Sequence, residues 1–429
     1  MDALLKIFVV FACMLALTRW RVHMGLALFG GGVALCLWAG RGFTTTASDI
    51  VAALRAAELW LLMLITLLIF ELGRHMAEDR NAQVIMGWAR AWGGRHGRAV
   101  SLMAIPSVIG LVPMPGGALF SAPLVAQTAS EPTWDPAWKS AVNYWFRHTW
   151  EYWWPVFPVV IVTVAIFDLE MSRFIAMQLP LSLVSLAVGY WILIRPHVDK
   201  LIMTAPPPGL SVRAVGRVAA PLAAVVLSTV LLPPVFSDWL PEATAQTRTL
   251  VALLVGLLVG LILILIDSRT MTLRELICRL RDRKAWDLIG TIAGVILFKN
   301  LMAQSGLVPI AGEQLIESGI PLSGIAALLP LVAGFVTGIA IGFAGIAFPL
   351  LLGLAESPGV EISAASLLFL GFASGYAGMM LSPVHLCFIL SRGYFSAPLK
   401  GMYRYILPCT GLTLLMAVVL YVIRLQLGF

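Results

Sequence analysis

Hydrophobic residues occupy this chain in runs of roughly 20, the length that a helix needs to cross the ~30 Å apolar core of a bilayer. Strands of a membrane β-barrel would be about half as long and would alternate between apolar and polar positions. The pattern therefore predicts an all-α polytopic membrane protein. Its uninterrupted runs predict spans near residues 3–18, 22–40, 57–76, 174–194, 215–236, 248–266, 286–304 and 402–424.

Two further apolar segments are interrupted by glycine or proline in their middle. Residues 98–129 break at 113–117, and residues 321–355 break at 338–345. The pieces beside the first break are too short to cross a bilayer alone, and backbone that is not helical must be shielded from lipid. Both segments are therefore predicted to form re-entrant hairpins.

Two other segments have the length of a span but contain a break. Residues 138–167 are interrupted around 150–155, and residues 363–391 around 378–383. A proline ends each interruption, and proline removes a backbone donor and disrupts a helix. The sequence predicts two broken helices here.

The same landmarks recur in the two halves of the chain. Pro155 and Pro383 are 228 positions apart (383 − 155), and Pro180 and Pro408 are separated by the same interval (408 − 180). Each half also has its hairpin and its broken helix in the same order. Broken segments in corresponding positions of two repeats are typical of secondary transporters and lie near the substrate site.

The predicted repeats cover residues 1–195 and 215–429, joined by a proline-rich cytoplasmic linker at 196–214. Each contains five spans and one hairpin, and an odd number of spans inverts the second repeat relative to the first. A basic stretch with tryptophans at 77–97 is expected to lie on the membrane surface as an interfacial helix.

Composition and charge agree with this interpretation. Only 12% of residues are charged and 60% are hydrophobic, whereas soluble domains carry about 25% charged residues. The net charge of +7 does not indicate nucleic-acid binding, because the basic residues fall in alternate loops between spans. The positive-inside rule then places both termini outside the cell.

The positions of the cysteines indicate neither a metal site nor a disulfide framework. The five cysteines are scattered and have no metal-ligand or disulfide spacing. Neither a bound metal nor another cofactor is therefore predicted.

The polar residues of the first broken helix are the main candidates for substrate contact. Asn143, Arg147, His148 and Glu151 precede Pro155 in an otherwise apolar span. Charges at this depth are costly and usually face a cavity or a partner. Arg147 or His148 is expected to meet an anionic group, and Glu151 to handle a proton or a cation. The alternative is an interfacial aromatic belt with charges that reach toward water.

The hairpin tips are the second set of candidates. Pro115, Gly116 and Gly117 in the first hairpin, with Gly342 and Gly345 in the second, could expose backbone amides to a ligand. Helix N-termini after such breaks also attract anions. Tight packing of small residues is the alternative explanation.

The second broken helix offers Ser382 for substrate binding and His385 for ion coupling. A serine and exposed carbonyls beside a helix break could coordinate a cation, and a histidine could relay protons. A histidine that only packs between helices is an equally good interpretation.

Particular motifs resemble one known family. They are the Pro-Gly-Gly region at 112–125, the run Asn-Tyr-Trp-Phe-Arg-His at 143–148, and Glu151 with Tyr152. They look like an uncharacterised integral-membrane family of the ion transporter superfamily, related to gluconate, citrate and dicarboxylate transporters. The resemblance implies two inverted repeats, a homodimer and an elevator mechanism. The hairpin tips lack the Ser-Asn-Thr signature of the dicarboxylate members.

The sequence thus predicts a secondary active transporter of an organic anion, coupled to H⁺ or Na⁺, in the bilayer of a bacterial or archaeal inner membrane. A carrier of a lipid or cell-wall precursor is an alternative. An intramembrane enzyme is another, with His148 and Glu151 as acid and base. No nucleophile motif supports the enzyme, so the protein is predicted not to be one.

Overall fold

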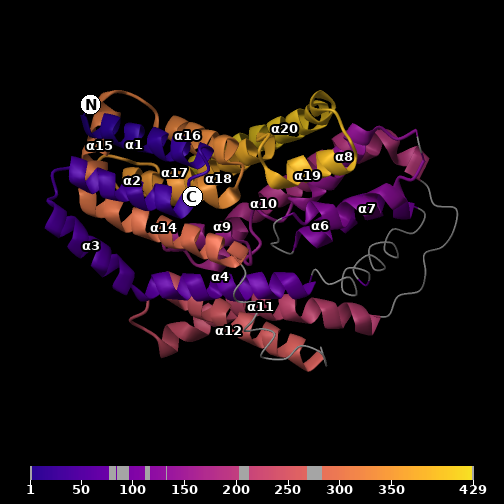
Figure 1. The fold of residues 1–429 in the computed structure, drawn as a ribbon, viewed down its shortest axis with the longest axis horizontal. Coiled ribbons are helices and arrows are strands. Elements are labelled where there is room, and N and C mark those ends of the chain that lie inside the picture. The colour runs from indigo at the N-terminus through magenta and orange to yellow at the C-terminus, as the bar shows by residue number, and fades with distance from the viewer. Residues whose placement is uncertain are drawn as a thin grey trace.

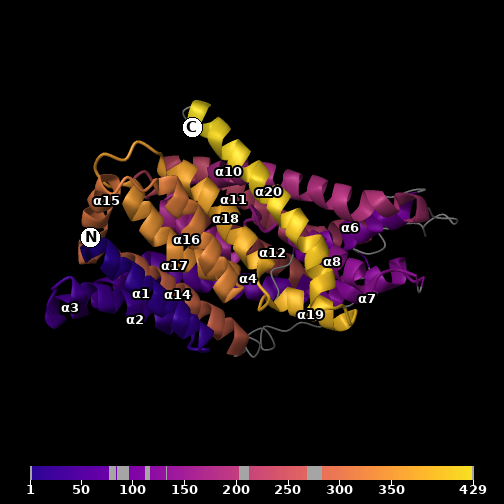
Figure 2. The same cartoon turned by 90° about the horizontal axis from the view of Figure 1, so that it is seen from above.

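Every regular element in the described part of the chain is a helix (Figures 1 and 2). The computed structural model describes residues 2–76, 84, 96–111, 116–131, 133–201, 212–267 and 283–427. Elements of the first half are α1 (Asp2–Arg19), α2 (Met24–Trp38), α3 (Phe43–Arg55), α4 (Ala57–Met76), α6 (Gly97–Gly110), α7 (Ala118–Thr128), α8 (Pro136–Arg147), α9 (Pro158–Phe167) and α10 (Met171–Gly189). The π turn η2 (Tyr190–Ile194) and the 3₁₀ helix η3 (Arg195–Leu201) follow.

The second half has the same helical character. Its elements are α11 (Val212–Trp239), α12 (Ala245–Asp267), α14 (Arg283–Ser305), α15 (Leu307–Glu317), α16 (Leu322–Thr337), α17 (Ala340–Ala355), α18 (Ala364–Leu381), α19 (Leu386–Tyr394) and α20 (Leu399–Leu427). The predicted all-α class is confirmed.

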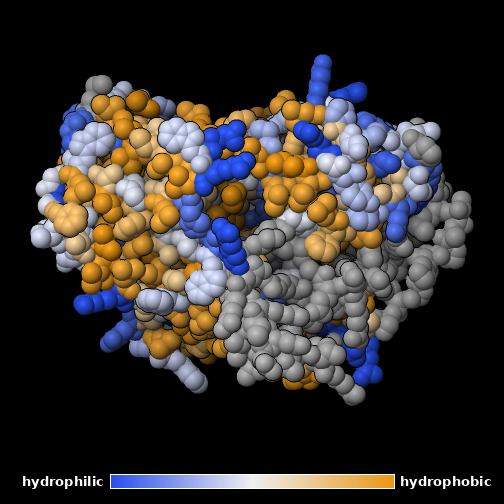
Figure 3. Space-filling view, in the orientation of Figure 1, coloured by the Kyte–Doolittle hydropathy of each residue, from blue (hydrophilic) through white to orange (hydrophobic). Residues whose placement is uncertain are grey.

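The protein is a multi-pass membrane protein. Within the described residues, six helical stretches are long and apolar enough to span a bilayer, or seven if α3 and α4, which meet at 51°, form one span. Broad hydrophobic areas cover the face in Figure 3, and exposed apolar residues include Leu64, Leu328 and Leu415. Such surface is stable against lipid and unfavourable in water.

Two segments differ from the sequence-based expectation. Residues 43–55, which lie between the spans predicted at 22–40 and 57–76, form α3. The predicted linker begins as helix η3, because His197 packs edge-on against Trp134 and Trp138, with ring centroids 5.4 and 5.0 Å away. The rest of that linker, at 202–211, lies outside the described residues, as does nearly all of the predicted interfacial helix at 77–97.

Both predicted hairpin segments consist of two short helices, α6–α7 and α16–α17. The turn of the second is Gly338–Ile339, at the start of the break expected over 338–345. Gly338 has φ +64° and closes α16 in the left-handed conformation, which glycine adopts without strain. Gly342 and Gly345 consequently lie within α17 and not at the tip.

Proline sets one edge of each helix break. Ser382 and Phe157 have extended backbones, with ψ 124° and 129°, immediately before Pro383 and Pro158. A residue that precedes proline is disfavoured in the α conformation. The second break therefore begins at Ser382, four residues after Gly378, which remains inside α18.

Helices of the first half contact helices of the second half in corresponding pairs. Helix α7 contacts α19 and α17 contacts α9, so the second helix of each hairpin packs against the broken helix of the other half. Likewise α2 contacts α14 while α4 contacts α12, and α8 contacts α20 while α10 contacts α18. The two breaks thereby meet inside the protein, where residues 366–380 of α18 are buried without interruption.

Candidate functional site

Helix α8 and the break that follows it carry four polar residues to the interior. Asp135 caps the N-terminus of α8 by accepting a hydrogen bond from the Ala137 amide at 2.9 Å, a favourable start for a helix. At the other end Asn143, Arg147, His148 and Glu151 are only 0%, 2%, 2% and 8% exposed. This part of the sequence is therefore embedded in protein and is not an interfacial belt.

Arg147, the last residue of α8, connects the first helix break to the first hairpin. Its Nη1 donates to the carbonyl of Ile109 at 3.1 Å, at the end of α6. Its guanidinium also covers Gly117 at the start of α7: a Cβ added there would lie 2.4 Å from Nη2. Glycine at this position permits the close approach.

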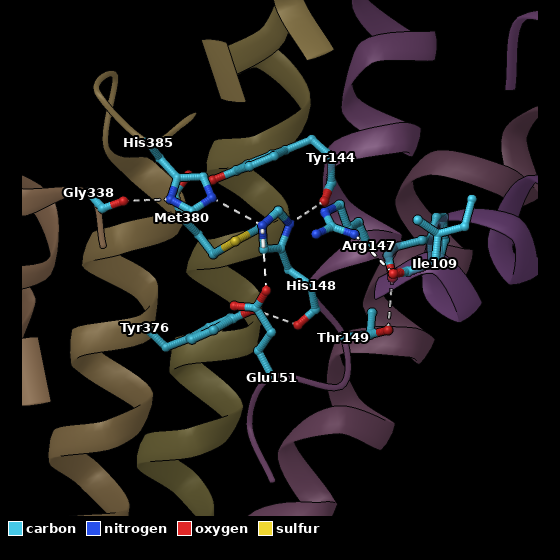
Figure 4. Close-up of polar contacts among 11 residues, drawn as sticks. Ile109, Tyr144, Arg147, His148, Thr149, Glu151, Gly338, Tyr376, Met380 and His385 are labelled. Carbon is cyan, nitrogen blue, oxygen red and sulfur yellow. Dashed lines mark hydrogen bonds and ion pairs between the residues drawn. The ribbon is translucent and has the colours of Figure 1, made fainter. Parts of the chain in front are cut away.

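The two broken helices meet at a pair of histidines (Figure 4). Nε2 of His148, the C-cap residue of α8, lies 3.1 Å from Nε2 of His385, the N-cap residue of α19. Nδ1 of His148 faces the Tyr144 carbonyl at 2.6 Å, and Nδ1 of His385 faces the Gly338 carbonyl at 2.6 Å. His385 therefore links the second break to the turn of the second hairpin.

A carboxyl and a tyrosine complete this cluster. Oε1 of Glu151 lies 3.9 Å from Nε2 of His148. The Tyr376 hydroxyl donates to the His148 carbonyl at 2.5 Å and lies 3.5 Å from Oε2 of Glu151. Tyr376 and His148 are 228 positions apart, the interval that separates the proline landmarks, so corresponding positions of the two halves touch here.

Asn143 holds a neighbouring junction together. Its Nδ2 donates to the Ala118 carbonyl at 3.0 Å and to Oγ of Ser391 at 2.9 Å. It thus connects α8 with the start of α7 and with α19. Gly116, with φ +79°, approaches the same helix through Leu390. Gly116, at the described end of the first hairpin tip, therefore faces the second broken helix.

The predicted site residues divide into two groups. Arg147, His148, Glu151 and His385 come together, with Gly116, Gly117 and Asn143 beside them, whereas Pro115 lies outside the described residues. Three others face elsewhere. Ser382 donates to the Phe335 carbonyl at 2.6 Å, a Cβ on Gly342 would meet Thr337, and one on Gly345 would meet Val295.

Cys387 and Tyr376 belong to the cluster but were not expected from the sequence. Cys387 is buried, at 7% exposed, and its thiol lies close to both imidazoles. With His148 and His385 it forms a set of three possible metal ligands whose donor atoms all lie within 4.8 Å of one another. The only sequence signal is the short spacing of His385 and Cys387, because His148 is far away in the chain.

A pocket of about 250 Å³ opens beside the second hairpin turn. Two of its lining residues are basic, Arg19 and Arg21, and it also touches Ile339 of the turn and Val384, the neighbour of His385. A positively charged opening therefore lies next to the second break.

Comparison with a solved structure concerns the fold. The crystal structure of the YdaH transporter of Alcanivorax borkumensis superposes with a TM-score of 0.57 at 14% sequence identity. The match covers 90% of this chain and 88% of that one. The two proteins therefore share a helical membrane fold over nearly their whole length.

Comparison of the sequence identifies the family. No curated protein matches it. A family profile described as a protein of unknown function, DUF401, matches residues 1–207 and 243–423, most of the chain. The protein belongs to the DUF401 family.

Proposed function

We propose that this protein is a secondary active transporter of an organic anion, driven by a gradient of H⁺ or Na⁺. The observation that carries the proposal is Arg147, a buried cation at the end of α8, placed against the first hairpin tip where two broken helices meet. A charge inside an apolar helical protein is costly and typically marks a ligand pathway.

The surroundings of Arg147 favour an anionic ligand. Helix α7 starts at Ala118, next to the guanidinium, and has no side-chain cap on its N-terminal amides. The positive end of a helix and an arginine together attract carboxylates and phosphates. Asn143, at the same junction, adds an amide group.

The pocket beside the second hairpin supplies a route of entry for this class of ligand. Arg19 and Arg21 would raise the local concentration of anions at its mouth. The pocket reaches Val384, so a modest movement of the second hairpin turn would extend it toward His385. This movement is part of the proposal.

Transport requires alternating access, and the paired contacts suggest how it arises. Two inverted repeats, residues 1–195 and 215–429, would each supply one hairpin and one broken helix to a shared site. We propose an elevator movement in a homodimer, in the inner membrane of a bacterium or archaeon with both termini outside. The fold likeness to a protein described as a transporter supports the transport class.

Binding of anions is expected to raise the thermal stability of the purified protein. A ligand at about 100 times its Kd stabilises the native state by roughly 2.7 kcal/mol. Differential scanning fluorimetry across carboxylates and phosphates, at several pH values and Na⁺ concentrations, measures the shift. A rise in Tm only in the presence of Na⁺ would identify the coupling ion.

Gradient-dependent flux into proteoliposomes tests the function itself. Uptake of a stabilising anion should require an imposed H⁺ or Na⁺ gradient and should stop when an ionophore removes that gradient. Protein-free liposomes are the control. The proposal is rejected if folded, correctly inserted protein moves no member of a broad anion panel and none raises its Tm.

A further inference from the structure

We propose that His148, His385 and Cys387 form a binding site for a transition-metal ion of the Zn²⁺ class, which joins the two helix breaks. This site goes beyond the proposed transport of an anion and does not depend on it. Each of the three residues is buried, and their donor atoms lie within 4.8 Å of one another.

The separation of the imidazoles suits two ligands of one ion. Their Nε2 atoms are 3.1 Å apart. Tetrahedral zinc with Zn–N bonds of about 2.0–2.1 Å places two ligand nitrogens roughly 3.3 Å apart. Only a small adjustment of the two side chains is needed to admit the ion.

The hydrogen bonds of the two imidazoles place the ring hydrogen on the same atom, Nδ1, in both residues. Nδ1 of His148 faces the Tyr144 carbonyl and Nδ1 of His385 faces the Gly338 carbonyl, each at 2.6 Å. A carbonyl can only accept, so each Nδ1 carries the hydrogen. In the neutral rings both Nε2 lone pairs then point at each other, an unfavourable arrangement unless a cation lies between them. Histidine ligands of metals typically donate their other N–H in this way.

The third ligand selects the kind of metal. Cys387 follows His385 by two residues at the start of α19, and its thiol lies within 4.8 Å of the donor nitrogens of both rings. A thiolate with two imidazoles favours zinc and neighbouring soft or borderline ions over Na⁺, Mg²⁺ and Ca²⁺, which prefer oxygen.

The charges around the cluster are compatible with a divalent ion. Glu151 lies 3.9 Å from Nε2 of His148, and its carboxylate places a negative charge beside the three ligands. A Cys387 thiolate and the Glu151 carboxylate together would balance two positive charges. Arg147 is a further buried cation nearby, and its guanidinium donates to the Ile109 carbonyl.

Cobalt binding to the full-length protein tests the site directly. Co²⁺ replaces zinc in such sites, and a cobalt–thiolate bond gives a charge-transfer absorption in the near ultraviolet. We expect the metal-free protein, purified in detergent, to bind one equivalent of Co²⁺ with this absorption. Addition of Zn²⁺ should displace the cobalt and remove the signal.

Matched cysteine variants assign the signal. Cys387→Ser should abolish the charge-transfer absorption, whereas Cys409→Ser, which alters another buried cysteine in α20, should retain it. His385→Gln should weaken binding at least about tenfold, because losing even an outer-sphere partner costs 10–100-fold. Circular dichroism and size-exclusion chromatography establish that each variant is folded.

Three results would overturn the site: no charge-transfer band in folded wild-type protein, an unchanged band in Cys387→Ser, or loss of the band in Cys409→Ser. A His148–His385 pair that shares a proton and excludes metal would give the first result. None of these measurements uses anion flux, so the metal site and the proposed transport can fail separately.

Discussion

Replacing Arg147 with glutamine is expected to reduce anion uptake at least tenfold, and to reduce the anion-dependent rise in Tm as well. The guanidinium is the buried cation at the hairpin tip, and a hydrogen bond to a charged group contributes about 1.5–3 kcal/mol, roughly 10–100-fold in binding. Proteoliposome flux per inserted protein, together with the thermal shift, measures both effects.

Two companion variants separate charge from geometry and from general damage. Arg147→Lys keeps the charge but loses the planar fork that binds a carboxylate through two N–H groups, so partial uptake is expected. Arg404→Gln removes an exposed cation from α20 and should leave uptake unchanged. Arg147→Gln protein that is folded and transports at the wild-type rate would refute the role of this residue.

Replacing Gly378 with alanine is expected to lower the stability of the protein and to disturb the histidine pair. A Cβ at Gly378 would lie 2.0 Å from the backbone carbonyl oxygen of Leu331, so α16 and α18 must separate. Overpacking of this kind costs about 1–3 kcal/mol. Gly338 is the C-cap residue of α16, and its carbonyl holds His385. Displacement of α16 therefore also moves that imidazole.

Gly411→Ala is the matched control for this substitution. Gly411 is also a helical glycine, in α20, but a Cβ there meets nothing within 4 Å. Its replacement should be neutral or slightly stabilising, since alanine is a better helix former than glycine. Thermal unfolding of the two variants side by side measures the difference, and equal midpoints would contradict the close approach of α16 and α18.

Long apolar runs were predicted more accurately than their breaks. The apolar run at 57–76, predicted as a span, is helical throughout as α4, because an uninterrupted hydrophobic run in a membrane has no alternative to a helix. The break in the second hairpin was expected over eight positions and occurs at Gly338–Ile339. Glycines at several positions could have ended α16. The turn at Gly338 is held by a partner from a distant segment of the chain, His385.

The candidate site residues likewise differ in how far the sequence alone could identify them. Arg147, His148 and Glu151 could be singled out because a charge in an apolar segment is conspicuous. Gly117 and Gly345 could not be told apart, since glycine indicates close approach but not what approaches. The structure places the Arg147 guanidinium against Gly117 and a valine side chain against Gly345.

The sequence by itself determined that this chain is an all-α membrane protein with polar, proline-broken segments, because hydrophobicity and proline act locally. The meeting of the breaks was decided only by the tertiary structure. Cys387 is 239 positions from His148 (387 − 148), and the packing of α8 against α19 brings them together. Local propensities do not encode a contact between residues so far apart in the sequence. Tertiary packing therefore added to the candidate site a cysteine that the sequence had not singled out.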